Sequence, residues 1–219
     1  MKKLNIPQNK EELIQMTKQS FVDSKKVTIE QFKKKLYEIK PDFIVDNSNK
    51  ILLNDIFLYV NNESGLNRKL DPKKGVFMWG DIGAGKSTLI KMLGEWLRIV
   101  GEGYKTINCS VLANQYSANG LLALNSSTYN ENEFGVCNPV NRAFDELGRE
   151  PRPAKHFGNE LNVMEYILQC RYELRNQCRT FVTTNITPEG VKKLYGDYIY
   201  DRINEMFNIV EVYGKSYRK

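Results

Sequence analysis

A glycine-rich segment that joins an apolar run to a helical pattern carries residues suited to phosphate chemistry. The run GVFMW leads directly into GDIGAGKSTLI, which fits G-x-x-x-x-G-K-[ST]. In this arrangement backbone N–H groups surround phosphate oxygens, and the helix N-terminus adds partial positive charge. Lys86 is expected to reach the β- and γ-phosphates, and the Ser87 hydroxyl to ligate Mg²⁺. The segment therefore predicts a nucleoside triphosphate site formed by Gly80, Asp81, Ile82, Gly83, Ala84, Gly85, Lys86, Ser87 and Thr88.

Two adjacent carboxylates follow a second apolar run, in AFDELG. Asp145 is expected to hold the magnesium ion through water, and Glu146 to orient and activate an attacking water. Two carboxylates at a strand end favour a hydrolase over a small-molecule kinase. The alternative interpretation is an acidic strand end that only caps the next segment.

A polar strand end lies further along the chain, in RTFVTTNITP, where Thr183, Thr184 and Asn185 close an apolar run. An asparagine on the strand beside the phosphate loop is suited to hydrogen-bond the attacking water and the γ-phosphate. The alternative interpretation is a turn-forming asparagine before Thr-Pro.

The elements that must position these residues alternate between strands and helices. This alternation predicts an α/β fold, a P-loop NTPase with a parallel sheet and helices on both faces. Residues 114–140, rich in Asn, Ser and Gly, are predicted as a long loop region. Helices are expected at 87–100, 158–177 and 187–196, and strands within 75–79, 104–110, 142–148, 179–185 and 207–213.

The N-terminal region, residues 1–62, is predicted to be helical. Thr28 to Gln31 has capping-box spacing, Pro41 ends the helix that follows, and Ser48 is a plausible N-cap for the next one. That next helix is expected to present one mostly apolar face, which would either pack on the main domain or dock a partner: Ile51, Leu52, Asp55, Ile56, Tyr59 and Val60. NNESGLNRKLDPKKG marks a boundary before the ATPase core, residues 63–219.

Composition excludes several classes of protein. No apolar run is long enough to span a membrane, and the start lacks the apolar stretch of a secretory signal, so we expect a cytoplasmic protein. The four cysteines form no C-x-x-C pair and His156, read as a loop residue, is the only histidine, which argues against a zinc site or a Ser-His-Asp triad. The net charge of +6 suits contact with nucleic acid or an acidic partner, although many solvated surfaces look the same.

The order of these motifs, together with two closing arginines, resembles the AAA+ ATPases of the DnaC/IstB-type helicase-loader family over about residues 70–219. The matching stretches are GVFMWGDIGAGKSTL, FDELG, LQCRYELRNQCRTFVTTN and YIYDRINEMFNIVEVYGKSYRK. The resemblance implies a five-stranded sheet without a C-terminal lid domain. It also implies Walker B roles for Asp145 and Glu146, and a sensor 1 role for Asn185.

In the same family the arginine of the DR pair is an arginine finger that acts on the ATP of a neighbouring subunit, and a terminal arginine acts as sensor 2. By motif position these roles fall on Arg202 and Arg218. The alternative is that both arginines only pair with nearby acids such as Asp201 or Glu205.

The family resemblance implies a function in DNA replication. It predicts an ATPase that uses Mg²⁺, assembles head-to-tail on ATP, contacts single-stranded DNA, and binds a replicative helicase through the N-terminal region. Candidate DNA contacts are Arg171, Arg175, Arg179, Tyr116 and Tyr129, although helix salt bridges explain the arginines equally well. An IstB-like transposition ATPase, a P-loop small-molecule or nucleotide kinase, and a nucleotide-sensing scaffold with little turnover remain as alternatives.

Overall fold

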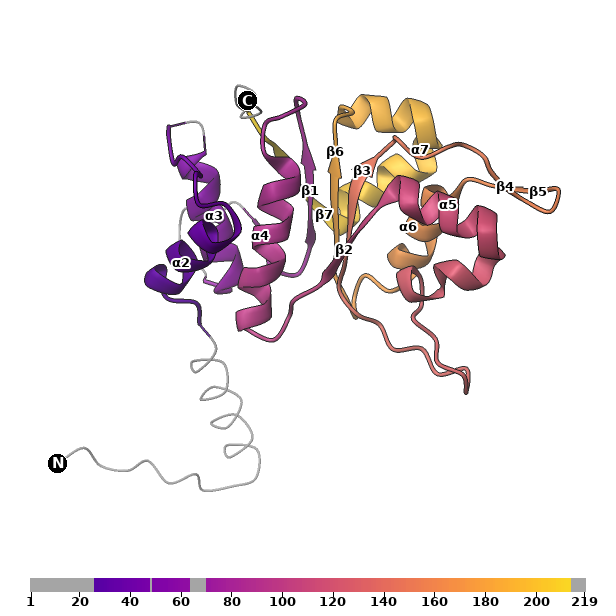
Figure 1. Cartoon of the computed structure of the whole chain (residues 1–219), viewed down its shortest axis with the longest axis horizontal. Helices are drawn as coiled ribbons and strands as arrows, with labels where there is room; N and C mark the ends of the chain where they lie inside the picture. Colours follow the sequence, from indigo (N-terminus) through magenta and orange to yellow (C-terminus); the bar gives the residue numbers. More distant parts are fainter. Residues whose placement is uncertain (1–25, 48, 64–69, 214–219) are drawn as a thin grey trace, which may run out of the picture.

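A five-stranded sheet forms the centre of the molecule in the computed structural model, which describes residues 26–47, 49–63 and 70–213 (Figure 1). The strand order is β2-β3-β6-β1-β7, and every neighbouring pair is parallel. The predicted parallel sheet is thereby confirmed. The strands are β1 (Gly75–Trp79), β2 (Lys105–Asn108), β3 (Arg142–Leu147), β6 (Thr180–Thr184) and β7 (Phe207–Glu211).

Helices cover both faces of this sheet (Figure 1). In the interior strand β1, Val76 and Met78 pack into one hydrophobic cluster, whereas Phe77 packs into the other. Successive side chains of a strand point to opposite faces, so a strand buried on both sides must be apolar throughout. One face is covered by α4 (Lys86–Ile99), and the other by α5 (Cys109–Asn119), α6 (Val163–Glu173) and α7 (Pro188–Met206).

Two N-terminal helices, α2 (Ile29–Ile39) and α3 (Lys50–Val60), precede the sheet. The predicted capping box is present, because the Gln31 backbone N–H donates to Thr28 Oγ1 and the Thr28 backbone N–H donates to Gln31 Oε1. Helix α2 ends before Pro41, as predicted. Asn49 is the N-cap residue of α3, and the predicted N-cap, Ser48, lies outside the described residues.

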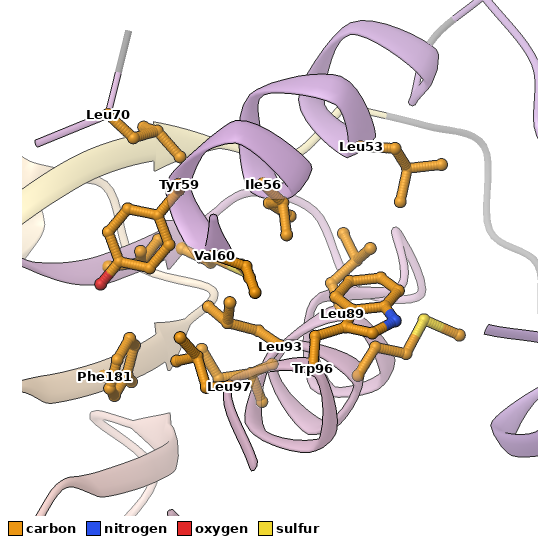
Figure 2. Close-up of a cluster of buried hydrophobic side chains, with 14 of the residues drawn as sticks. Leu53, Ile56, Tyr59, Val60, Leu70, Leu89, Leu93, Trp96, Leu97 and Phe181 are labelled. Carbon is orange, nitrogen blue, oxygen red and sulfur yellow. The ribbon is translucent and has the colours of Figure 1, made fainter. Parts of the chain in front are cut away.

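These helices pack on the main domain. The rings of Phe32 and Trp96 stack with centroids 3.7 Å apart, and the Trp96 indole N–H donates to the Phe32 carbonyl. Ile51 is 63% exposed, so it lies outside the part of the predicted apolar face that packs on the main domain. The buried residues of α3 are Leu53, Ile56, Tyr59 and Val60, which meet Leu89, Leu93, Trp96 and Leu97 of α4 (Figure 2).

About half of the segment predicted as a long loop, residues 114–140, is helical. Helix α5 runs to Asn119 and continues into a 3₁₀ segment, η1 (Gly120–Ser127), so only the part beyond it is irregular. Tyr116 and Leu124 anchor this segment in the core under α5. Most of its polar residues are exposed, and this polarity concealed the few buried positions that decide the fold.

A short hairpin replaces the start of the helix predicted at 158–177. Strands β4 (Ala154–His156) and β5 (Asn159–Leu161) pair antiparallel, and helix α6 begins only at Val163. Phe157 and Gly158 form the turn with φ of 45° and 85°, the left-handed conformation of tight hairpin turns. His156 is therefore a strand residue, and its ring nitrogen Nδ1 lies 3.1 Å from the Ser117 carbonyl oxygen.

Helix α7 extends beyond its predicted end. The helix bends at Gly196, where φ is 83° and ψ is 170°, and continues through the segment that carries Arg202. Glycine adopts this conformation without steric cost. Among the described residues, no helix combines the length and apolar character needed to cross a membrane.

Candidate active site

The glycine-rich loop between β1 and α4 has the conformation expected of a phosphate-binding loop. Gly80, Gly83 and Gly85 have φ of 139°, 88° and 91°, values that disfavour residues with a Cβ atom. At Gly80 a Cβ atom would lie 2.4 Å from the Val212 carbonyl oxygen, so the close approach of the chain after β7 also requires glycine. The loop therefore needs glycine for its backbone path, independently of any ligand.

Lys86 begins helix α4 and folds back over this loop. Its Nζ donates to the carbonyl oxygens of Gly80 and Asp81 at 2.8 and 2.7 Å, and the residue is buried. A buried ammonium group needs several acceptors. Phosphate oxygens entering the loop would supply stronger, charged acceptors at the same place.

Three oxygen-bearing side chains converge beside the start of α4. The Ser87 hydroxyl donates to Asp145 Oδ1 at 2.8 Å, and the Thr183 hydroxyl donates to the same carboxylate oxygen. These residues come from α4, β3 and β6, which meet at the carboxyl edge of the sheet. Hard oxygen donors of this kind suit Mg²⁺, so Ser87 and Asp145 fit the predicted metal-binding role.

Glu146 occupies a strained position next to Asp145. Its φ is 63°, at an irregularity in the pairing of β3 with β6, and its backbone N–H donates to Thr183 Oγ1 at 3.0 Å. Its two carboxylate oxygens accept from Asn108 Nδ2 and from Arg149 Nη1, each at 3.0 Å. The left-handed backbone directs the carboxylate along the edge of the sheet, where these two partners hold it.

Asn108 and Arg149 were missed from the sequence. Asn108 ends β2 and pairs in register with Asp145. The rule that polar residues gather at the carboxyl ends of parallel strands would have found it, had the strand order been known. Arg149 lies in the turn after β3, and no sequence motif separates it from other surface arginines.

One pocket is lined by most of the predicted nucleotide-site residues, although Gly80, Asp81, Ala84 and Asp145 are not among those that line it. Asn185, directly after β6, lines it together with Lys86, Ser87 and Glu146. Lys40, at the end of helix α2, also lines this pocket and was not expected there. The remaining lining residues are Ile82, Gly83, Gly85, Thr88, Thr183 and Thr184.

Arg202 lies elsewhere, on the surface formed by α6 and α7. Its guanidinium carbon is 3.6 Å from the ring centroid of Tyr198 and 4.3 Å from that of Tyr172. A guanidinium nitrogen is 3.8 Å from Glu173, and the side chain is 15% exposed. The ion-pair partner is thus Glu173 and not the neighbouring acids considered from the sequence. Arg218 lies outside the described residues.

Two of the arginines considered for DNA contact maintain the fold. Arg171 is fully buried and donates to Thr180 Oγ1 and to the carbonyl oxygens of Val140 and Arg179, and burial lowers its pKa. Arg179 donates to the Tyr59 hydroxyl and to the carboxylate of Glu102.

The other candidates for DNA contact differ in how deeply they are buried and in the contacts they make. Tyr116 is buried in the core. Tyr129 is partly buried, and hydrogen bonding to Cys170 together with burial raises its pKa to about 12. Arg175 stacks on Tyr172 at 3.9 Å and pairs with Glu205. Tyr116 is therefore unavailable for DNA contact.

The sheet order, the glycine-rich loop and the convergence of polar strand ends define a P-loop fold of the AAA+ type. Solved structures share this fold. The chain aligns with a protein described as a primosome component from Streptococcus pyogenes serotype M3, with TM-score 0.59, 18% identity, and coverage of 92% of this chain and 100% of that one. It aligns with the DnaC helicase loader with TM-score 0.58, 17% identity, and coverage of 82% and 99%.

A replication initiator is also similar in fold. The structure of DnaA bound to AMPPCP and single-stranded DNA aligns with TM-score 0.51 and 16% identity over 80% of this chain and 49% of that chain. The fold predicted from the resemblance to the helicase loaders is confirmed by these neighbours. No protein-family model matches the chain, and no curated protein matches it in sequence.

Proposed function

We propose that this protein binds and hydrolyses ATP and acts in DNA replication as a DnaC-like helicase loader. The observation that carries the proposal is the meeting at one edge of the sheet of five residues from α4, β3 and the segment after β6: Lys86, Ser87, Asp145, Glu146 and Asn185. The fold similarity to the DnaC helicase loader supports the replication role.

The reaction proposed is ATP + H₂O to ADP and phosphate. The loop N–H groups and Lys86 hold the phosphates, while Ser87 and Asp145 would hold Mg²⁺, which neutralises charge on the β- and γ-phosphates when bound. Asn185 orients the attacking water, and Glu146 accepts its proton. In the structure Glu146 is engaged by Asn108 and Arg149, so its carboxylate must turn from these partners before it can act.

Arg202 is proposed to complete the site of a neighbouring protomer. Arg202 is not among the described residues that line the pocket of its own chain, and it lies on the outer surface of α6 and α7. A cation supplied from the next subunit would stabilise charge that develops on the γ-phosphate. Such a head-to-tail interface generates a ring or an open helical filament.

Contact with single-stranded DNA is proposed to involve the β4–β5 hairpin. Phe157 at its tip is 94% exposed, and Lys155 lies next to the tip on β4. An exposed aromatic ring beside a basic side chain is suited to stacking on a base while the cation contacts the backbone. The DnaA neighbour was solved with single-stranded DNA, which supports this class of ligand.

The proposed helicase contact is assigned to the N-terminal region, residues 1–62, by analogy with the loaders. An IstB-like transposition ATPase is the alternative within the same fold, and it predicts stimulation by duplex rather than single-stranded DNA. A P-loop kinase would instead transfer phosphate to a small acceptor, and the adjacent carboxylates of Asp145 and Glu146 favour hydrolysis over that reaction.

The test is ATP hydrolysis measured against protein concentration, with and without single-stranded or duplex DNA. Arg202→Ala is expected to abolish turnover but retain ATP binding, and Lys86→Ala to lose ATP binding. Mixing the two variants should partly restore activity, because an intact Arg202 then meets an intact pocket. Turnover per protomer that is independent of concentration, with a silent Arg202→Ala, would contradict assembly and the role in trans.

A further inference from the structure

Lys40 is a second lysine in the nucleotide pocket, and it comes from outside the P-loop core. It is the C-cap residue of α2, and its backbone N–H donates to the Leu36 carbonyl oxygen. Its side chain lines the pocket together with Gly83, Gly85 and Lys86. Among the described residues that line the nucleotide pocket, Lys40 is thus the one contributed by the N-terminal helices.

The packing of α2 on α4 sets the position of Lys40. Phe32, two turns earlier in α2, stacks on Trp96 of α4 and accepts the indole hydrogen bond. Leu36, one turn before Lys40, is buried in the same cluster. Because α4 begins at the phosphate loop, this packing holds the end of α2 beside the loop that would receive the phosphates.

The charges in the pocket favour an anion next to Lys40. Among the described lining residues the charged ones are Lys40, Lys86 and Glu146, and Glu146 is engaged by Asn108 and Arg149. Lys40 pairs with Asp42 at 2.7 Å, with the two side chains 42% and 68% exposed. Such a surface pair contributes little, so exchanging Asp42 for a polyphosphate that carries several charges is favourable.

We infer that Lys40 contacts the phosphate chain of the bound nucleotide, and that this contact makes the N-terminal helices respond to the occupancy of the ATP site. The inference rests on the proposed ATP site and extends it to a residue outside its motifs. A lysine ammonium is a compact charge with three donors and a flexible stem, which suits a contact that forms only when phosphate is present.

Binding of the Mg²⁺ complex of AMPPCP, measured by calorimetry at several salt concentrations, tests this inference. Lys40→Ala is expected to weaken binding about five- to tenfold, and to reduce its salt dependence, because one charge-assisted contact is lost. Lys40→Arg should remain close to the wild type. The matched control is Lys34→Ala, which removes an exposed lysine of the same helix that does not line the pocket.

The outcomes separate this inference from the proposed function. If Lys86→Ala loses binding while Lys40→Ala binds within twofold of the wild type, the role of Lys40 is refuted and the ATP site stands. If Lys86→Ala also binds normally, the ATP site itself is refuted. A loss in Lys40→Ala with unchanged salt dependence would place Lys40 against an uncharged part of the nucleotide and overturn the phosphate contact.

Hydrogen exchange tests the coupling to the N-terminal helices. AMPPCP should slow exchange of the backbone amides in the last turn of α2, where the Lys40 N–H donates to Leu36, since anchoring the side chain suppresses local opening. The same protection should be absent in Lys40→Ala at a concentration of AMPPCP that saturates it. Equal protection in both proteins would refute the coupling.

Discussion

The nucleotide pocket and the Arg202 surface hold their charged residues in different ways. In the pocket, Lys86 lies at the start of α4 and Glu146 near the end of β3. The Lys86 side chain donates to two backbone carbonyl oxygens, and the Glu146 backbone N–H donates to the Thr183 hydroxyl. On the other surface, Arg202 is held between the side chains of Tyr172 and Tyr198. Because the backbone fixes the pocket, replacing a functional group there should change activity without moving the neighbouring residues. Because ring stacking positions Arg202, replacing one of the two tyrosines should displace its guanidinium.

The largest effect should come from the chemistry of the pocket. Glu146→Gln keeps the shape and the hydrogen bond with Asn108 but removes the base. Hydrolysis is expected to fall by about 10²- to 10⁴-fold while AMPPCP binding persists. Single-turnover hydrolysis and nucleotide titration measure the two effects. Turnover within tenfold of the wild type would show that another group accepts the proton.

Glu150→Ala should break the contact between the strand end that carries Glu146 and helix α7, which carries Arg202. The Glu150 side chain is fully buried and accepts from the Tyr195 hydroxyl, the Gly148 backbone N–H and Arg152. It thereby links the turn after Glu146 to α7. Arg152 keeps its hydrogen bond to the Tyr195 hydroxyl in this variant, but the Gly148 N–H and the Tyr195 O–H lose their acceptor. This loss is expected to cost about 3 kcal/mol of the free energy of unfolding, measurable by urea denaturation.

The matched control for Glu150→Ala is Tyr195→Phe, which removes one donor to Glu150 and one acceptor of Arg152 but leaves the other contacts of Glu150 in place. Its expected cost is about 1 kcal/mol. Burial is the main cause that raises the pKa of Tyr195 well above its usual value, so the hydroxyl remains a donor throughout the accessible pH range. Equal free energies of unfolding for the two variants would show that the buried Glu150 carboxylate does not join the turn after β3 to α7.

The stacking of Arg202 should be weakened by Tyr198→Ala. The guanidinium loses its closest ring but keeps its charge, so concentration-dependent hydrolysis is expected to fall about three- to tenfold with AMPPCP binding unchanged. Tyr200→Ala, on the same helix, is the control that leaves the contacts of Arg202 intact. If Tyr198→Ala matches the wild type while Arg202→Ala is inactive, the stacking has no part in positioning Arg202.

The smallest effect is expected at Arg149, whose ion pair with Glu146 is partly exposed. Arg149→Ala should release the carboxylate from one of its two partners. We expect a rise in basal hydrolysis of about two- to threefold, because the competing contact contributes less than about 1 kcal/mol. Steady-state assays without DNA measure it, and a fall in activity would indicate that Arg149 assists the reaction.

Several elements could be predicted because their signals are local. The glycine-rich loop requires left-handed backbone conformations at particular positions, and the capping box of α2 needs only residues three apart. The hairpin at Phe157 was not predictable in this way, because its turn uses a non-glycine residue at positive φ and its second strand falls in the segment predicted as a helix. The helical part of 114–127 was missed since only a few of its residues are buried.

By itself the sequence determined the P-loop, the alternation of strands and helices, and the polar residues at strand ends, since each depends on neighbours along the chain. Only the tertiary structure decided which residues meet. The order β2-β3-β6-β1-β7 brings Asn108 to Glu146, and the packing of α2 on α4 brings Lys40 to the phosphate loop. Such contacts join residues far apart in the chain, and no local pattern encodes them.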